Sequence, residues 1–293
     1  MTHTIQLLGI DLGTSSVKAA LFDANSLALL SSASVEYPLL CPQPGFAEQN
    51  PEDWWNAVVR AVKAALSPIS AVNVRAIGLS GQMHGLVRLR PDLSPAGNAI
   101  IWADTRSVEE TQLLATFQRA SRSILPGAPA VGFMASTLLW LKHNDPDGLE
   151  KVAVCILPKD YIRLRLTGSV GGDHSDASAT GLYDIAAQSW APDIVEACGL
   201  RPDQLPSLSA SDAAIGELSR EASARLGLRE GTPVAAGTAD LPAQALGHGI
   251  TRPGSVLATI GTGGQWMVPI DRPRPDSMQR YYVFRHNVPD CWY

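Results

Sequence analysis

The feature that most constrains this chain is a strand, glycine turn, strand pattern that occurs twice, far apart in the sequence. Residues 5–23 hold two apolar runs around Asp11-Leu12-Gly13-Thr14-Ser15, and residues 255–270 repeat the arrangement around Gly261-Thr262-Gly263. Apolar runs joined by a short glycine-containing turn predict a β-hairpin. Two such hairpins at this separation predict an internal duplication.

Both turns have groups that can hold a phosphate. Glycine lets the backbone turn tightly, and backbone amides and hydroxyls can donate to phosphate oxygens. The candidate phosphate-binding residues are Gly13, Thr14 and Ser15 in the first turn and Gly261, Thr262 and Gly263 in the second. Asp11, at a strand end, is a candidate metal ligand. Taken alone, each turn is equally well explained as an ordinary hairpin turn, whereas the pair favours a phosphate clamp.

Helices and strands alternate between the two turns. Asn50 precedes Pro51 as a candidate N-cap, Ser107 and Glu110 have capping-box spacing, and Gly168 can stop a helix. We therefore expect helices from residue 51 and over residues 107–120, 158–166 and 189–198, and strands at 74–80, 86–89, 99–102 and 233–237. This order predicts an α/β fold with a mixed sheet, because hairpins interrupt the alternation.

The best candidate for a domain boundary is the turn Thr-Arg-Pro-Gly at residues 251–254. We expect residues 1–250 to form an N-terminal domain and residues 251–293 to begin a second one. The remainder after this boundary is too short for a second domain of matching size. The second domain is therefore expected to be incomplete.

Polar side chains after two of the expected strands are candidates for binding a substrate. Gln82, Met83 and His84 lie between two glycines after the 74–80 strand, where an amide and an imidazole can bond hydroxyl groups in a cleft. Trp102 ends the expected 99–102 strand, and Asp104 follows it. The alternatives are a histidine satisfied within its turn, a core tryptophan, and an aspartate paired with the nearby arginine at position 106.

Asp240 is the candidate catalytic residue. It follows the strand at 233–237, and a carboxylate at a strand end can accept the proton of an attacking hydroxyl. Its alternative role is the N-cap of the helix that follows, which the local sequence alone favours.

The composition argues against two classes of partner. A net charge of -5 and a pI near 5.7 give no basic surface for neutralising a phosphate backbone, so no nucleic acid is expected. No apolar run approaches the roughly 18 to 20 residues of a membrane-spanning helix, and the N-terminus does not resemble a signal peptide. The four cysteines lack CxxC spacing and are expected as reduced thiols. A cytoplasmic protein without a membrane partner is expected.

In their order along the chain, these residues resemble the FGGY family of carbohydrate kinases. Gly81-Gln82-Met83-His84-Gly85 is most similar to the xylulokinase branch of that family. The similarity also includes residues 9–15, 102–106, 158–161, 176–178, 237–240 and 261–263. Each motif alone is weak, whereas the ordered set is highly specific.

The resemblance implies two actin-like (ribonuclease H-like) domains with a sugar and MgATP bound between them. It implies that Asp240 is the general base and that Met83 and His84 hold the substrate. Asp11, Thr14 and Ser15 match the first phosphate loop of the family, and residues 261–263 match the second. ATP and Mg²⁺ are the cofactors implied, because phosphoryl transfer depends on alignment and charge neutralisation.

Two departures from the family pattern bear on function. Xylulokinases usually have asparagine directly after the catalytic aspartate, where this chain has Leu241. The family also continues past the second phosphate loop to glycine-rich segments that hold adenosine, which residues 264–293 do not contain.

We therefore expect a kinase that transfers the γ-phosphate of ATP to a ketose hydroxyl, with D-xylulose to D-xylulose 5-phosphate as the leading reaction. The alternatives are another substrate of the family (gluconate, ribulose or another polyol), a non-catalytic sugar-binding remnant, and an actin-like filament protein. The expected partners are a small sugar and ATP, and a homodimer is the candidate assembly.

Overall fold

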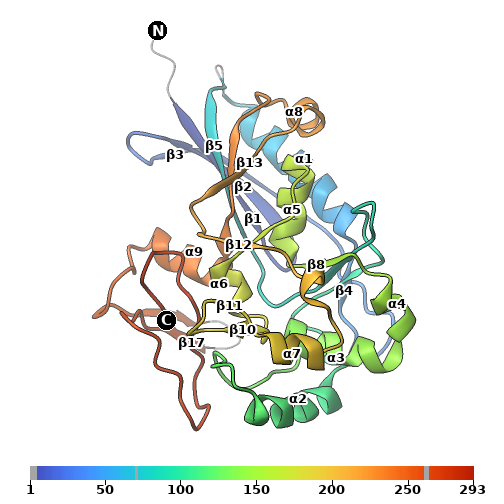
Figure 1. The fold of residues 1–293 in the computed structure, drawn as a ribbon. Helices are drawn as coiled ribbons and strands as arrows, with labels where there is room; N and C mark the ends of the chain where they lie inside the picture. Colours follow the sequence, from blue (N-terminus) through green and yellow to red (C-terminus); the bar gives the residue numbers. More distant parts are fainter. Residues whose placement is uncertain (1–4, 70–71, 261–263) are drawn as a thin grey trace.

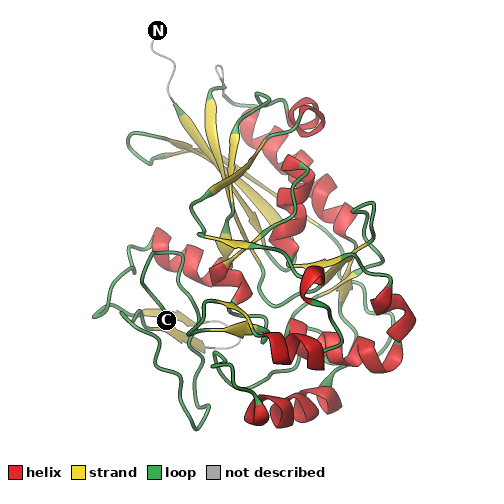
Figure 2. Ribbon diagram, in the orientation of Figure 1, coloured by secondary structure: helices red, strands yellow, loops and turns green. Residues whose placement is uncertain are grey.

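The computed structural model describes residues 5–69, 72–260 and 264–293. Within these ranges, seven strands form one mixed sheet in the order β13-β14-β5-β1-β2-β3, and β15 also pairs with β5. The strands are β1 (Gln6–Leu12), β2 (Ser16–Asp23), β3 (Leu29–Glu36), β5 (Val74–Gly81), β13 (Ala214–Glu217), β14 (Pro233–Ala235) and β15 (Thr238–Ala239). Figures 1 and 2 show this twisted sheet beside the helices that cover it.

Strand direction changes within the sheet. β1, β2 and β3 are antiparallel neighbours, whereas β5 runs parallel to β1, and β14 and β15 run parallel to β5. This confirms the expected α/β fold with a mixed sheet.

One face of the sheet is covered by three helices, α1 (Pro51–Leu66), α5 (Pro158–Thr167) and α8 (Arg220–Leu226), which also contact one another. Alternate residues of β1 point to this face, and Leu8, Ile10 and Leu12 are buried there. Since strand side chains alternate between faces, Asp11 lies on the opposite, partly open face. The main apolar core therefore lies on one side of the sheet and the polar strand ends on the other.

A second apolar core lies beyond the sheet, around α2 (Val108–Ala120), α3 (Met134–Asn144) and α7 (Pro192–Ala197). Short elements join this layer to the sheet: β4 (Glu48–Gln49), β6 (Val87–Leu89), β7 (Ala99–Ile100), α4 (Pro146–Glu150), β8 (Val154–Ile156), β9 (Gly172–Asp173), α6 (His174–Ala177), β10 (Tyr183–Asp184), β11 (Ser189–Trp190), the 3-10 turn η1 (Pro202–Gln204) and β12 (Leu208–Ser209).

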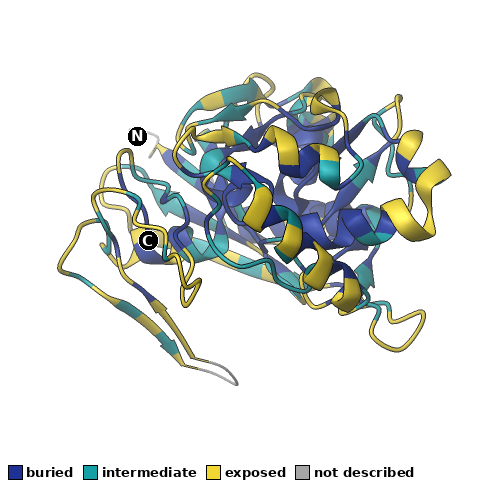
Figure 3. Cartoon of the chain, turned by 60° about the horizontal axis from the view of Figure 1, so that its bottom comes forward, coloured by how far each residue is buried: buried dark blue, intermediate teal, exposed yellow. Residues whose placement is uncertain are grey.

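The C-terminal segment begins with helix α9 (Asp240–Gly247) and continues into a two-stranded ribbon, β16 (Leu257–Ile260) and β17 (Gly264–Met267). The two strands are antiparallel, which confirms the second predicted hairpin, and within the described residues they pair only with each other. Ile260 and Trp266 on the ribbon are 88% and 77% exposed. Figure 3 shows the ribbon extending away from the buried body of the molecule.

Most predicted helix boundaries are close to those observed, and the exceptions have physical causes. Asn50 caps α1 by accepting a bond from the amide of Glu52 at 3.0 Å, and Gly168 ends α5 in the left-handed conformation. The predicted capping box at Ser107 is wrong, because the hydroxyl of Ser107 is buried and makes no cap bond.

Two predicted elements are shorter than expected. The helix expected over 189–198 is split, because Pro192 starts α7 after the short strand β11. The strand expected over 99–102 ends at Ile100, so Trp102 lies in the following turn. Among the described residues, no helix combines the length and apolar character needed to cross a bilayer.

Candidate active site

Three parallel strands end at the same edge of the sheet and bring the predicted site residues together. In the pairing of β1 with β5, Asp11 lies opposite Ser80, and in the pairing of β15 with β5, Ala239 lies opposite Gly81. Asp240 therefore begins α9 beside the point where β5 passes into Gln82. Carboxyl ends of parallel strands are common positions for ligand sites in α/β folds.

Gly237 makes this arrangement possible. Its φ is +84°, and a Cβ at this position would lie 2.7 Å from the backbone oxygen of Leu79. A residue with a side chain would be strained in this conformation and would clash with β5. Glycine therefore allows the chain to leave β14 and pair again with β5 just before Asp240.

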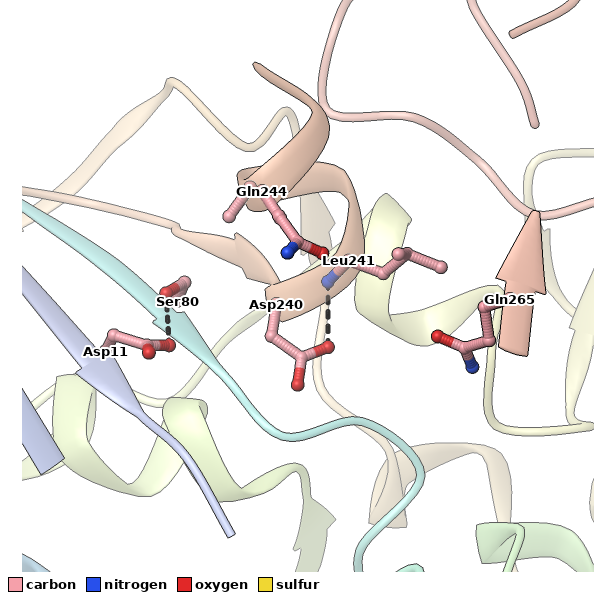
Figure 4. Close-up of a pocket in the computed structure, with 7 residues that line it drawn as sticks. Asp11, Ser80, Asp240, Leu241, Gln244 and Gln265 are labelled. Carbon is pink, nitrogen blue, oxygen red and sulfur yellow. Dashed lines mark hydrogen bonds between the residues drawn. The ribbon is translucent and has the colours of Figure 1, made fainter. Parts of the chain in front are cut away.

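The strand ends open into a cleft with a volume of about 490 Å³. It is lined by Asp11, Ser80, Asp240, Leu241, Ala243, Gln244 and Gln265. Figure 4 shows the carboxylates of Asp11 and Asp240 in this one opening, with Gln265 of β17 across from the start of α9. Two residues that the sequence assigned to separate motifs thus share a cavity.

Asp240 has the environment expected of a proton acceptor. Burial of the carboxyl, together with the negative charge of Asp11, raises its pKa from 3.8 to about 6, although the amide of Leu241 donates to Asp240 Oδ1 at 2.8 Å. The alternative N-cap role is wrong, because Asp240 is the first helical residue and Ala239 occupies the cap position. The carboxylate therefore remains available to the cleft.

Asp11 is suited to a magnesium ion that also contacts phosphate. One of its oxygens accepts a bond from the Ser80 hydroxyl at 2.6 Å, and its side chain lines the cleft. Among the described residues, no cluster of three or more histidine, cysteine or acidic side chains can enclose a metal by itself. Mg²⁺ is commonly bound by one or two carboxylates together with water and substrate phosphate, and Asp11 fits that pattern.

The first glycine turn, which contains the candidate phosphate-binding residues Gly13, Thr14 and Ser15, is held from outside through its carbonyl groups. The hydroxyl of Tyr37 donates to the carbonyl of Gly13, Gln49 Nε2 donates to that of Thr14 at 2.6 Å, and the Tyr37 amide donates to that of Ser15 at 3.2 Å. Within the described part of the chain, no hydrogen bond uses the amides of Thr14 and Ser15. These amides are therefore free to donate to a phosphate. The second turn, Gly261, Thr262 and Gly263, lies outside the described residues.

His84 is held in a strained, partly buried arrangement. Its φ is +69°, its Nδ1 is 2.5 Å from the carbonyl oxygen of Ala179, and its ring stacks on Phe133 at 4.0 Å. Burial lowers the pKa of His84 to about 4, so the imidazole is neutral at physiological pH. A neutral ring that donates from Nδ1 keeps Nε2 as an acceptor for a hydroxyl.

The glycines at the two ends of this segment make room for helix α5. Gly81 and Gly85 have no positive φ; a Cβ at these positions would instead lie 3.1 Å from Lys159 and 2.9 Å from Pro158. They are needed because the start of α5 packs against this turn.

The other two members of the segment are buried. Gln82 donates from Nε2 to Gln49 Oε1 at 3.0 Å, and its own Oε1 has no partner among the described residues. Met83 belongs to the apolar cluster against which Leu241 packs. Because Leu241 follows Asp240 directly, this contact places Met83 near the start of α9. The substrate roles predicted for Gln82, Met83 and His84 stay predictions.

Trp102 and Asp104 differ in their availability to a ligand. Trp102 is 47% exposed, and its indole Nε1 donates to the hydroxyl of Thr14 at 2.9 Å. Asp104 is buried, and its oxygens accept bonds from Arg106 and, at 2.7 Å, from the amide of Ala47. The substrate roles of Trp102 and Asp104 both stay predictions. The contacts of Asp104 do not favour its role, because its oxygens already accept bonds from the protein.

Sequence reasoning missed three polar residues that line the cleft: Ser80, Gln244 and Gln265. Gln244 lies one helical turn after Asp240, and Gln265 follows the second glycine turn, so helical spacing and proximity to that turn were the available signals. Ser80 is brought to Asp11 by the β1–β5 register, which short-range patterns do not reveal.

Comparison with known proteins agrees with this fold. Residues 6–247 match the model of the N-terminal domain of the FGGY family of carbohydrate kinases. The chain is 36% identical over 290 residues to a xylulose kinase of Bacillus subtilis, covering 98% of this chain and 58% of that protein. It is 30% identical over 288 residues to a gluconokinase of the same species, covering 96% of this chain and 55% of that protein.

Among solved structures, xylulose kinase from Rhodospirillum rubrum superposes with a TM-score of 0.89 at 28% identity, over 98% of this chain and 60% of that one. The chain thus has an α/β fold that it shares with carbohydrate kinases. More specifically, the chain belongs to the FGGY family of carbohydrate kinases. It spans about 58% of the length of the curated relatives it matches.

Proposed function

We propose that this chain carries the sugar-binding part and the general base of an ATP-dependent kinase that phosphorylates a ketose hydroxyl. The observation that carries the proposal is the shared cleft of Asp11 and Asp240, in which the pKa of Asp240 is raised to about 6. A carboxylate with this pKa is mostly ionised at neutral pH and is a stronger base than an ordinary aspartate.

The proposed chemistry assigns one role to each group. The substrate hydroxyl attacks the γ-phosphorus, the bond from that phosphorus to the ADP oxygen breaks, and Asp240 accepts the hydroxyl proton. The free amides of Thr14 and Ser15 hold phosphate oxygens. Magnesium, held by Asp11 with water and phosphate, would neutralise the negative charge of the phosphates.

D-Xylulose is the leading substrate, with D-xylulose 5-phosphate as the product. Two observations support it: the Gln82-Met83-His84 segment is similar to the xylulokinase branch, and the chain is 36% identical to a xylulose kinase. ATP is the phosphoryl donor that the family implies. We further propose that residues 1–250 form the sugar-binding domain and that residues 251–293 begin the ATP-binding one; a match to the N-terminal family domain that ends at residue 247 supports this division.

A second candidate is a kinase for a different polyol or sugar acid, such as gluconate. Leu241 favours it, because an apolar side chain lines the cleft where xylulokinases usually have asparagine. The similarity to a gluconokinase points the same way.

A coupled assay of ADP release with a panel of sugars, carried out on the full-length gene product, separates these candidates. Xylulose, ribulose, gluconate and glycerol would each be tested with MgATP, and sugar binding to the same protein would be measured by calorimetry. Turnover of xylulose above the other three supports the leading proposal. Turnover of gluconate without xylulose supports the second, and sugar binding without any turnover indicates a sugar-binding protein that lacks catalysis.

A further inference from the structure

The backbone directly before Asp240 is held by a side chain from a distant part of the sequence. The amide of Ala239 donates to Ser175 Oγ at 3.2 Å, and Thr238 Oγ1 lies 2.8 Å from the same oxygen. Strand β15 contains only Thr238 and Ala239, and it pairs with β5 through these two residues alone. So short a strand needs further contacts to hold a fixed position.

Ser175 is itself fixed by a buried aspartate. Its hydroxyl donates to Asp173 Oδ2 at 2.5 Å, and its amide donates to the same oxygen at 2.8 Å. Because the single hydroxyl proton goes to this carboxylate, the oxygen of Ser175 must accept from both Thr238 and Ala239. The direction of every bond around Ser175 is therefore determined.

The aspartate is held in turn by a lysine. Asp173 Oδ1 lies 2.8 Å from Lys159 Nζ, and both side chains have no exposed surface. The ammonium also contacts Asp160 at 2.7 Å. Burial by itself lowers the pKa of Lys159, but the negative charges of Asp160, Asp173 and Asp176 outweigh that effect and raise the pKa above its usual range. The bonds from Ser175 to the Asp173 carboxylate are charge-assisted and directional, and the buried ion pair with Lys159 holds that carboxylate in place, so this chain of contacts resists reorientation.

We propose that Ser175 is a positioning residue for Asp240, connecting the buried Lys159–Asp173 pair to the backbone that aims the base. Ser175 does not touch the cleft; it acts through Ala239. Its contribution is to hold the carboxylate of Asp240 at a fixed angle to the substrate hydroxyl, and a displacement of about 1 Å can cost on the order of 100-fold in rate. The inference rests on the proposed role of Asp240 as base.

The chain offers a matched control. Ser211 Oγ also donates to Asp173 Oδ2, at 2.8 Å, but within the described residues its side chain makes no hydrogen bond to Thr238 or Ala239. Ser175→Ala and Ser211→Ala thus each remove one donor from the same carboxylate. Only the first releases the backbone before Asp240.

The kinetic test compares both variants with the wild type in the sugar-dependent ADP-release assay. Ser175→Ala is expected to lower kcat by about 10- to 100-fold while the KM for sugar changes less than about 3-fold, because binding groups are untouched. Ser211→Ala is expected to stay within about 2-fold of wild type in both constants. A wild-type kcat in Ser175→Ala, or an equal loss in Ser211→Ala, would overturn the proposal.

A second measurement does not depend on activity. Amide hydrogen exchange followed by NMR should show the Ala239 amide exchanging at least about 10-fold faster in Ser175→Ala and unchanged in Ser211→Ala. Equal exchange in the two variants would count against the proposal. If the wild type shows no sugar-dependent phosphoryl transfer, the kinase assignment is wrong, and the exchange of Ala239 alone decides whether Ser175 fixes this strand.

Thr238→Val provides the test if Ser175→Ala does not fold. Valine keeps the shape of threonine and removes the hydroxyl that donates to Ser175. It should lower kcat by about 3- to 10-fold with an unchanged sugar KM. Wild-type kinetics in this variant, together with unchanged exchange at Ala239, would contradict the role given to Ser175.

Discussion

Trp102 Nε1 donates a hydrogen bond to the hydroxyl of Thr14 at 2.9 Å, which joins a candidate sugar-binding residue to the first phosphate turn. The indole is 47% exposed and lies in the turn after β7. We expect the two side chains to be energetically coupled. A double-mutant cycle of Trp102→Phe and Thr14→Val, followed by urea denaturation, should give a coupling energy of about 0.5 to 1.5 kcal/mol. Additive effects of the two substitutions would show that the bond contributes nothing.

Asp240→Asn should strongly reduce turnover while leaving sugar binding nearly intact. The amide keeps the shape of the side chain and can still accept the bond from Leu241, but it cannot take a proton at neutral pH. We expect turnover to fall by a factor on the order of 100 or more, with sugar affinity nearly unchanged. ADP release and calorimetry measure the two quantities. Asp203→Asn, at a side chain that is 75% exposed, is the control for loss of one negative charge, and wild-type turnover in Asp240→Asn would eliminate this residue as base.

The same substitution should stabilise the protein at neutral pH. The pKa of Asp240 is raised from 3.8 to about 6, so the folded protein binds this proton more tightly than the unfolded chain does. The contribution of Asp240 to the free energy of unfolding therefore falls as the pH rises from about 4 to about 6 and is constant above that range. The free energy of unfolding of Asp240→Asn should therefore exceed that of the wild type by about 1 to 3 kcal/mol near pH 7.

Denaturant unfolding at a series of pH values checks this prediction. The difference in the free energy of unfolding between Asp240→Asn and the wild type should shrink as the pH is lowered through about 6 and vanish near pH 4. A stability difference that is the same at all pH values would mean that ionisation of Asp240 does not cause the difference.

Leu241→Asn should shift the choice of sugar. Leu241 lines the cleft beside the base, and asparagine would place an amide there that can bond a substrate hydroxyl. If a ketose hydroxyl faces this position, the KM for xylulose should fall by about 3- to 30-fold relative to that for gluconate. Ala243→Ser adds a hydroxyl to the same wall of the cleft and tests whether any polar group suffices. An unchanged ratio of the two KM values in Leu241→Asn would place the sugar elsewhere.

Gly237→Ala should be strongly destabilising. Alanine at φ +84° is strained, and its Cβ would lie 2.7 Å from the backbone oxygen of Leu79, which cannot move without disturbing β5. We expect a loss of about 2 to 4 kcal/mol in the free energy of unfolding. Gly247→Ala is the control, because a Cβ there would meet no atom within 4 Å. Equal stability of the two variants would refute the packing argument.

Local sequence patterns predicted the elements well where one residue decides the conformation. Asn50 and Gly168 act through their own side chain or its absence, and both were predicted correctly. Ser107 failed because its hydroxyl is buried away from the helix amides, which depends on tertiary packing that spacing does not encode. The same limit applies to Ser80 and Ser175, whose partners are 69 and 64 residues away.

The site was predictable in its residues and only partly in its geometry. Asp11 and Asp240 were named from their positions at strand ends, and the structure brings them into one cleft. Asp104 was named by the same reasoning, but its buried pairing with Arg106 and Ala47 is decided by neighbouring elements. A strand end therefore predicts where a carboxylate lies, and not which groups already occupy its oxygens.

The ribbon of β16 and β17 has a practical consequence for handling this protein. Two strands that pair only with each other in the described residues, with Ile260 and Trp266 largely exposed, have little of the burial that protects backbone from opening. A protease that cuts beside large apolar residues should cleave there well before it reaches the seven-stranded sheet. Digestion time courses would then give the stability of the two regions separately from a single sample.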